Sequence, residues 1–339
     1  MGFWAFIARR IILAFLVLMI VSIATFTMAH AIPGDPISLV LGDRQADNPE
    51  VRAALERRWG FDKPLPMQYI YYVSNLLRGD WGESISSRSP VADALRERVP
   101  ATAELSFYAL LFAIVTGVPL GIIAALNQDR WPDHLSRLIT LIGTSIPVFW
   151  LGLLMLYVFF YQLKWLPGPG RLDVGMDPPD RITGMVTVDA FLHGDWDILR
   201  AALRRLVLPS IVLGSFSMGI IARMLRSSLL ASLGDDYVRT ARAKGLSDHA
   251  VVINHALRNA LIPTVTILGL TAAGLLAGAV LTETIFSWPG IGSFAVAAAL
   301  KRDYPALLGV TLIVAVIYIF VNLVVDVIYG LLDPRIRSV

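Results

Sequence analysis

Long apolar stretches without a charged residue constrain this chain more than any other feature. A helix needs about 20 apolar residues to cross the hydrocarbon core of a bilayer, and one Asp, Lys or Arg at mid-bilayer costs roughly 2.5–3.5 kcal/mol. One stretch of 17 residues, 206–222, is at the lower limit for a span. We therefore expect an all-α polytopic membrane protein with six transmembrane helices, the other five lying within residues 11–34, 105–128, 138–163, 259–282 and 304–325.

The composition also indicates that lipid is the main environment of the chain. Hydrophobic residues make up 56% and charged residues only 16%, whereas soluble chains carry about 25% charged residues. The chain has no cysteine, which excludes disulfides, thiol nucleophiles and Cys-ligated metals. A formal net charge of +3 is too small to indicate nucleic-acid binding.

The position of the basic residues predicts the orientation, because Lys and Arg accumulate on the cytoplasmic side. Arg9 and Arg10 precede the first span, and Arg335 and Arg337 follow the last, so both termini are expected in the cytoplasm. The first span has an alternative interpretation as a cleaved signal peptide, with an Ala-His-Ala end at residues 29–31. Its apolar run is about twice the usual length for a signal peptide, which favours a retained membrane anchor.

Two long segments are expected on the outer side, residues 35–100 and 167–205. The first contains two helix-like stretches, at 49–59 and 66–77. The second is rich in Pro and Gly at its start and ends in a helical stretch at 195–206 that leads into the fourth span. Glu104 and Glu283 are expected at the outer ends of their spans, close to water, with no special function.

The cytoplasmic segment between the fourth and fifth spans is basic and interrupted by glycines. Gly234 ends a helix, Asp235 and Asp236 supply a cap for the next one, and the short helix 237–244 is basic along one side. Gly245 is the residue type that most easily ends a helix in the left-handed conformation. Ser247 then caps a third helix. The residues alone fit two interpretations equally: a knob that inserts into a partner, or a solvated basic loop.

Residues 235–246 read Asp-Asp-Tyr-Val-Arg-Thr-Ala-Arg-Ala-Lys-Gly-Leu and resemble the ATPase-docking loop of ABC importer permeases. More closely, it resembles the version found in the dipeptide/oligopeptide permease family. It departs from the general Glu-Ala-Ala…Gly pattern at 239–241, whereas Gly245 matches. Segments 30–36, 80–84, 283–292 and 333–337 also match this family, so the resemblance covers essentially the whole chain. It assigns the docking loop to residues 235–258, with Asp236, Arg239, Thr240, Ala241, Arg242, Lys244, Gly245 and Leu246 as the docking residues.

The resemblance implies a type I ABC importer transmembrane fold in a bacterial cytoplasmic (inner) membrane. Residues 1–34 would form the N-terminal transmembrane helix, 35–100 an extracytoplasmic loop region, 101–332 the transmembrane core and 333–339 a cytoplasmic tail. The implied partners are a second homologous permease, two cytoplasmic ABC ATPases, an extracytoplasmic solute-binding protein and membrane lipid. We expect no nucleic acid and no cofactor on this chain, with ATP and Mg bound by the ATPases.

The resemblance also implies a site at the outer end of the path. Residues 283–292 are expected to turn back toward the pore, with Glu283, Phe286, Trp288, Pro289 and Gly290 as an outer gate. The alternative is an anchor of aromatic residues at the membrane interface. Asp326, the only acid well inside an otherwise apolar span, either lines the path or pairs with a neighbour near the cytoplasmic end, and no partner is evident from the sequence.

The expected function is transport and not enzymatic catalysis. The chain has no Gly-x-x-x-x-Gly-Lys-Ser/Thr phosphate loop, so ATP hydrolysis requires another chain. Its five histidines lack metal-ligand spacing. Dipeptides or short oligopeptides are the expected substrates, with nickel chelates, glutathione or oligosaccharides as alternatives for the same architecture. An ATP-independent carrier or channel is the alternative from a different class.

Overall fold

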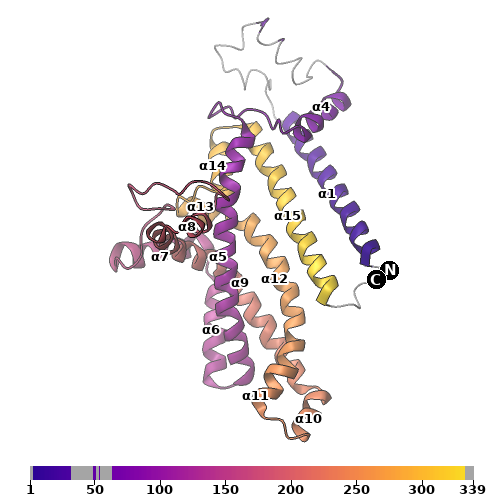
Figure 1. Ribbon diagram of the computed structural model, residues 1–339, viewed down its shortest axis with the longest axis vertical. Coiled ribbons are helices and arrows are strands. Elements are labelled where there is room, and N and C mark those ends of the chain that lie inside the picture. Colours follow the sequence, from indigo (N-terminus) through magenta and orange to yellow (C-terminus); the bar gives the residue numbers. More distant parts are fainter. Residues whose placement is uncertain (1–2, 32–48, 51–52, 54–62, 333–339) are drawn as a thin grey trace.

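The computed structural model describes residues 3–31, 49–50, 53 and 63–332, which form a helical molecule (Figure 1). These residues contain no β-strand and one isolated bridge, between Glu83 and Pro90. Most of the helix expected at 49–59, and the tail 333–339, lie outside the described residues. The elements, two of which (η1 and η2) are π-helical, are α1 (Phe3–Ala31), α4 (Leu65–Leu77), α5 (Val91–Leu126), α6 (Trp131–Ser145), α7 (Val148–Met155), η1 (Leu156–Gln162), α8 (Val186–His193), α9 (Trp196–Gly234), α10 (Asp236–Ala243), α11 (Asp248–Ala250), η2 (Val251–Leu257), α12 (Arg258–Gly278), α13 (Val280–Ile285), α14 (Ile291–Leu300) and α15 (Tyr304–Leu332).

Among the described residues, five helices are long and apolar enough to cross a membrane, and one bent pair raises the number to six. The five are α1, α5, α9, the continuous helix from α11 through η2 into α12, and α15. The shortest expected span, 206–222, lies within α9, a helix of 39 residues that also includes the helical stretch expected at 195–206. The predicted six-span, all-α class is therefore confirmed.

The third span is not the straight helix that the apolar stretch 138–163 predicts. Helix α6 and the helix formed by α7 and η1 meet at an angle of 105°. The break falls at Ile146 and Pro147, which are both extended, with ψ of 128° and 132°. The proline ring disfavours the helical conformation for the residue before it, and proline has no N–H to continue the helix. Hydropathy alone does not register this break.

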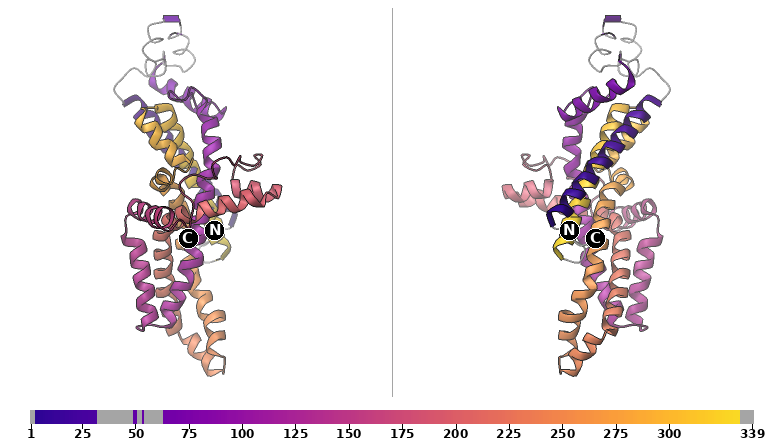
Figure 2. Two further views of the ribbon diagram at one scale, coloured as in Figure 1. Left: turned by 90° about the vertical axis from the view of Figure 1, so that its left-hand side faces the viewer. Right: turned by 90° about the vertical axis from the view of Figure 1, so that its right-hand side faces the viewer.

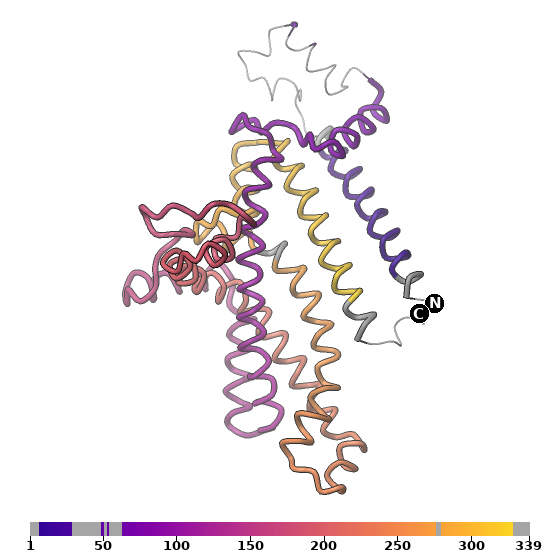
Figure 3. Tube along the Cα trace, viewed as in Figure 1, coloured from indigo at the N-terminus to yellow at the C-terminus, as the bar shows by residue number. Residues whose placement is uncertain are grey.

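The outermost helices bring the two described ends of the chain together. Helix α1 packs along α15, and the two run side by side (Figures 1 and 3). The helix expected at 66–77 is α4, which contacts α1 where the Tyr69 hydroxyl lies 2.7 Å from Ser22 Oγ. Figure 2 shows α10 and α11 at the opposite end of the molecule from α4, in agreement with the predicted orientation.

Glycines allow a close contact between α5 and α9. A Cβ added at Gly117 would lie 2.9 Å from the carbonyl oxygen of Met218, and one at Gly121 would lie 2.8 Å from that of Ala222. Small residues at this spacing let two backbones approach closely. The Gly117-x-x-x-Gly121 pattern in the sequence therefore marks a packing surface inside the chain.

A buried carboxylate fastens the outer segment 80–90 to the start of α15. Asp303 is fully buried, precedes α15 directly, and also accepts a hydrogen bond from the N–H of Ala306 in its first turn. Burial alone raises the pKa of Asp303, but the hydrogen bonds from the outer segment outweigh it and hold the pKa below its ordinary value of 3.8. These bonds come from Ser84 Oγ (2.5 Å), Ile85 N–H (3.1 Å) and Ser86 N–H (3.0 Å).

Replacement of Gly121 by alanine should lower the stability of the subunit. The added methyl would overlap Ala222 O and lie 3.0 Å from Leu225 Cβ, and overpacking of this kind costs about 1–3 kcal/mol. Gly234→Ala is the matched control, because nothing lies within 4 Å of its added Cβ; it should be neutral or slightly stabilising. Thermal unfolding in detergent measures both, and equal melting temperatures for the two variants would contradict the packing role.

Loss of the Asp303 carboxylate should destabilise the outer segment in a pH-dependent way. Because the pKa is lower in the folded than in the unfolded chain, the contribution is complete well above pH 3.8 and is lost as the pH falls through the folded pKa. Asp303→Asn should therefore unfold at a lower temperature than wild type at pH 7, and the difference should shrink at about pH 3. A difference that is constant across this range would argue against the charged carboxylate.

Candidate functional site

The elbow, residues 235–258, is built from two helix ends joined at a left-handed glycine. Helix α10 starts after Asp235, whose backbone is extended. The Asp235 side chain makes no capping hydrogen bond and Asp236 is already the first residue of the helix, so the predicted side-chain cap is wrong. Gly245 has φ of +81°. Its N–H donates to Arg242 O (2.9 Å), and the N–H of Leu246 donates to Ala241 O (3.4 Å). These two bonds form a Schellman motif, which is the helix end that the glycine predicts.

The next helix begins directly after this turn and runs on into the membrane-spanning part. Ser247 Oγ accepts a hydrogen bond from the N–H of Ala250 at 3.4 Å, as the sequence predicts. From Asp248 the helix continues without a break through η2 into α12, and Pro263 lies inside it. The elbow is therefore continuous with the fifth span.

An apolar cluster fixes the elbow to the helices above it. Val238 and Ala241 on the inner side of α10 are buried, as are Val251 and Ala256 of the next helix. Each fully buried Val or Leu side chain contributes about 1.5–3 kcal/mol, so α10 cannot move far without its neighbours. The cluster also includes Leu225 and Leu229 of α9, Ala125 of α5 and Ala260 of α12.

The opposite side of α10 faces solvent and carries the charges. Arg239 pairs with Asp236 at 3.3 Å, and Arg242 pairs with Asp248 at 3.3 Å. Such exposed pairs contribute at most about 1 kcal/mol each, so the side chains are available to a partner. The other predicted docking residues, Thr240, Lys244, Gly245 and Leu246, are also exposed, whereas Ala241 is buried in the cluster.

A buried ion pair joins the first turn of α6 to α9 above the elbow. Asp133 is fully buried and accepts two hydrogen bonds from Arg226, both 2.8 Å, in the bidentate arrangement that Arg–carboxylate pairs favour. Arg137 adds a third contact at 3.1 Å. The sequence did not single out Asp133; its one local signal is the i,i+4 spacing to Arg137.

At the other end of the spans, the predicted gate residues lie in a hairpin, residues 280–300, formed by α13, a turn and α14. Phe286 and Trp288 are 3% and 1% exposed. The Trp288 indole N–H donates to Ala101 O at 2.8 Å. Side chains buried inside the chain are not aromatic anchors at a membrane surface, so that alternative is wrong for both residues. Whether the hairpin acts as a gate stays a prediction.

Glu283 lies in the interior of this hairpin and not close to water as expected. It is fully buried, accepts from Thr102 Oγ1 at 2.6 Å and from the N–H of Ser293 at 2.9 Å, and is wrapped by the turn. A Cβ atom added at Gly290 would collide with its carboxyl group, and one added at Gly292 would collide with Val280. Because glycine has no Cβ, it allows the backbone of the turn to approach the Glu283 side chain this closely.

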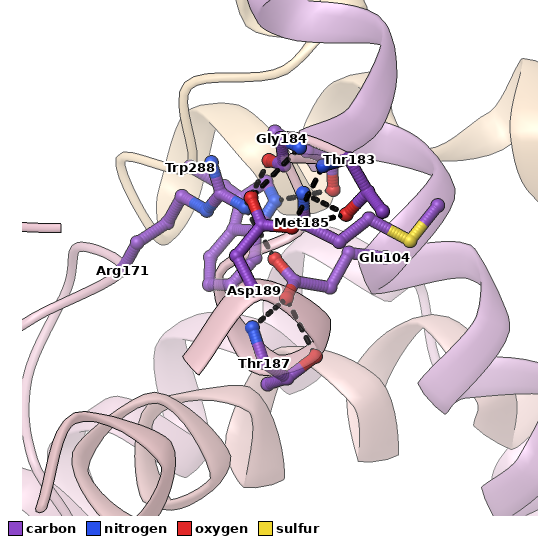
Figure 4. A network of polar contacts seen from close by, with 9 residues as sticks. Glu104, Arg171, Thr183, Gly184, Met185, Thr187, Asp189 and Trp288 are labelled. Carbon is purple, nitrogen blue, oxygen red and sulfur yellow. Dashed lines mark hydrogen bonds and ion pairs between the residues drawn. The ribbon is translucent and has the colours of Figure 1, made fainter. Parts of the chain in front are cut away.

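Glu104 is also buried, 1% exposed, which corrects the expectation that it is near water. Figure 4 shows its carboxylate between Arg171 and Thr187 of the second outer segment. Thr187 donates to Oε1 through both its N–H and its hydroxyl, at 2.7 Å each. Arg171 forms an ion pair with Oε2, donates to Gly184 O, and lies over the Trp288 ring, 5.4 Å from its centroid. The donors are 67 and 83 residues away in sequence, which explains why the sequence pattern did not reveal them.

Asp189 organises the same outer segment at the start of α8. Its carboxylate accepts bonds from Thr183 Oγ1 and N–H (2.6 and 2.8 Å) and from the N–H of Gly184 (2.9 Å). Burial raises the pKa of Asp189, but these hydrogen bonds outweigh that effect and lower it below its ordinary value. The group is therefore a charged structural centre at neutral pH.

Asp326 has a partner that the sequence did not reveal. Its Oδ2 lies 3.1 Å from Nε of Arg10, which joins α15 to α1. The ion pair agrees with the structural interpretation of this acid, and a role in lining the path stays a prediction. No group of three or more His, Cys, Asp or Glu residues in the described segments is arranged to hold a metal ion.

The described residues thus form a helical bundle with an elbow on one side and a buried hairpin toward the other. A model of the binding-protein-dependent transport system inner membrane component matches residues 117–338, and a model of the N-terminal part of such components matches residues 3–106. The chain belongs to this family. Its place is a bacterial inner membrane, which it crosses several times.

Curated relatives match the chain over nearly its whole length. A probable D,D-dipeptide transport system permease of Escherichia coli K12 is 46% identical, over 99% of this chain and 98% of its own. A di/tripeptide transport system permease of Pseudomonas aeruginosa is 47% identical, over 98% of each chain. A glutathione transport system permease of E. coli is 38% identical, over 98% of each chain. The resemblance drawn from the docking loop is confirmed.

A solved structure confirms the predicted type I ABC importer transmembrane fold. The chain resembles one from the inward-facing MetNI methionine ABC transporter, with a TM-score of 0.50 and 18% identity, over 69% of this chain and 93% of that one. At this level of identity the likeness concerns the fold only.

Proposed function

We propose that this chain is the permease subunit of an ABC importer that carries dipeptides or short oligopeptides across the inner membrane. The observation that carries the proposal is the full-length similarity to permeases of dipeptide and di/tripeptide transport systems. The chain is the transport component, and ATP hydrolysis belongs to partner subunits that bind ATP and Mg.

In this proposal, the elbow docks into a cytoplasmic ABC ATPase. Two features support it: an exposed, charged outer side on α10, and an inner side packed on α9 and α12. When the ATPases close, the elbow moves with them, and the apolar cluster transmits the displacement to the spans. A second homologous permease completes the path, two ATPases provide two docking sites, and a solute-binding protein delivers the substrate from outside.

Glutathione is the second candidate substrate, because a glutathione transport permease is also similar over the full length. Nickel chelates and oligosaccharides remain further candidates for the same architecture, although the relatives above do not favour them.

The direct test measures uptake by the reconstituted transporter together with its binding protein. ATP-dependent uptake of the dipeptide Ala-Ala supports the proposal. Uptake of glutathione without uptake of Ala-Ala would show that glutathione is the substrate instead. Uptake without any ATPase would indicate a carrier or channel.

Replacement of Gly245 by valine should uncouple the elbow while leaving the subunit in the membrane. A Cβ at this position meets nothing within 4 Å, so the cost is backbone strain at φ of +81°. That strain costs about 1–2 kcal/mol, which lowers the population of the docked conformation by a factor of roughly 5–30. ATP-driven uptake should fall accordingly. Gly245→Asn is the control, because Asn tolerates the left-handed conformation; equal uptake by the two variants would refute the role of this turn.

Truncation of Phe286 should weaken closure of the outer end. The ring packs in a buried cluster with Leu151, Leu208 and Val212, and Phe→Ala in such a site costs about 3–5 kcal/mol. We expect Phe286→Ala to transport fewer substrate molecules per ATP hydrolysed, whereas Phe286→Leu, which retains most of the volume, should change this ratio little. The measurement is uptake against ATP hydrolysis in proteoliposomes, and an unaltered ratio in the alanine variant would count against a gate.

A further inference from the structure

One turn of α5 holds two separate parts of the outer side. Thr102 holds the hairpin: its hydroxyl donates to Glu283 and accepts from the N–H of Ile291 at 2.8 Å. Glu104, half a turn further along, holds the second outer segment through Arg171 and Thr187. The positions of the hairpin and of this segment are thus set from the same turn.

Residues 165–189, which include the first part of the second outer segment and are called the outer loop below, also contact the hairpin directly. The N–H of Gly170 donates to Phe286 O at 2.8 Å. The next residue, Arg171, covers the Trp288 ring while it pairs with Glu104 (Figure 4). A guanidinium over an indole face within about 6 Å is attracted by the ring. Arg171 therefore contacts all three parts: the loop that contains it, α5 and the hairpin.

Other parts of the same loop face solvent. Val174 and Ile182 are 103% and 60% exposed, whereas the Glu104 and Arg171 side chains are 1% and 15% exposed. A partner on the outer side can contact the loop, but water has little access to the ion pair. An ion pair shielded from water is strengthened by the low local dielectric, so it can transmit a displacement of the loop.

We propose that Glu104 and Arg171 are a positioning pair through which the outer loop sets the position of the hairpin. The inference rests on the proposed function, in which a binding protein acts from outside and the hairpin closes the outer end. A shift of the loop displaces Arg171 and removes its contact with Trp288, which weakens the hold on the hairpin. Neither residue need touch the substrate.

The test uses the complete transporter with its ATPases, second permease and binding protein in proteoliposomes, supplied with alanine dipeptide. The measured quantity is the ratio of ATP hydrolysis with binding protein to hydrolysis without it. Arg171→Lys keeps a charge beside Glu104 but loses the planar group that reaches Gly184 O and covers Trp288. The double variant Glu104→Gln/Arg171→Gln leaves no unpaired buried charge, so it tests the link without the folding defect of a lone carboxylate.

Arg181→Gln is the matched control from the same loop. Pro100 has no N–H, which leaves Arg96 O without its helical donor, and Arg181 donates to that oxygen at 2.6 Å. Arg181 thus joins the loop to α5 as well, but it makes no described contact with the hairpin. This variant should retain the wild-type stimulation ratio.

Both test variants should reach the membrane at the wild-type level and lose stimulation by about fivefold or more, the lower end of typical coupling between two sites. A stimulation ratio equal to that of Arg181→Gln would overturn the inference. Absence of the double variant from the membrane would also overturn it, because the pair would then serve folding. If the wild-type transporter itself hydrolyses no ATP in response to the binding protein, the proposed function fails, whatever the variants do.

Discussion

Helices α5 and α9 approach each other so closely that a Cβ added at the facing glycines would collide with the backbone of the other helix. Gly117 and Gly121 on α5 and Gly214 on α9 leave no room for a side chain on the facing sides. The outer turn of α5 carries Thr102 and Glu104, and the inner end of α9 carries Arg226 and leads into the elbow. Both functional ends of the molecule are thus built on one tightly packed helix pair.

Buried carboxylates are the second feature that holds the structure together. Asp133, Glu104, Glu283 and Asp303 are at most 1% exposed, and each accepts hydrogen bonds from a segment distant in sequence. An unpaired charge in such surroundings would be costly, so each carboxylate requires its partners to be in place. For Glu104, Glu283 and Asp303, this requirement fixes segments of the outer side to the ends of the spans.

Hydropathy and sequence motifs are sufficient to predict the fold class, the number of spans, the orientation and the local shape of the elbow. The elbow was predictable because its determinants are local: Gly234, Gly245 and Ser247 act on their own neighbours. The buried carboxylates were not, because their partners are brought together only by the fold. From the sequence, Glu104 and Glu283 are therefore expected near water, and the partner of Asp326 is not evident. The bend at Pro147 was missed because an apolar stretch looks the same whether its helix is straight or broken.

The unbroken helix from Asp248 to Leu275 has a mechanical consequence. Its 28 residues make a rod about 42 Å long, which exceeds the hydrocarbon thickness of about 30 Å. Tilting such a rod by about 5° around one end moves the other end by nearly 4 Å. A small rotation imposed on its cytoplasmic end is therefore enough to shift the base of α13 by roughly the width of one methyl group. Geometry of this kind amplifies motion without requiring any part of the rod to bend.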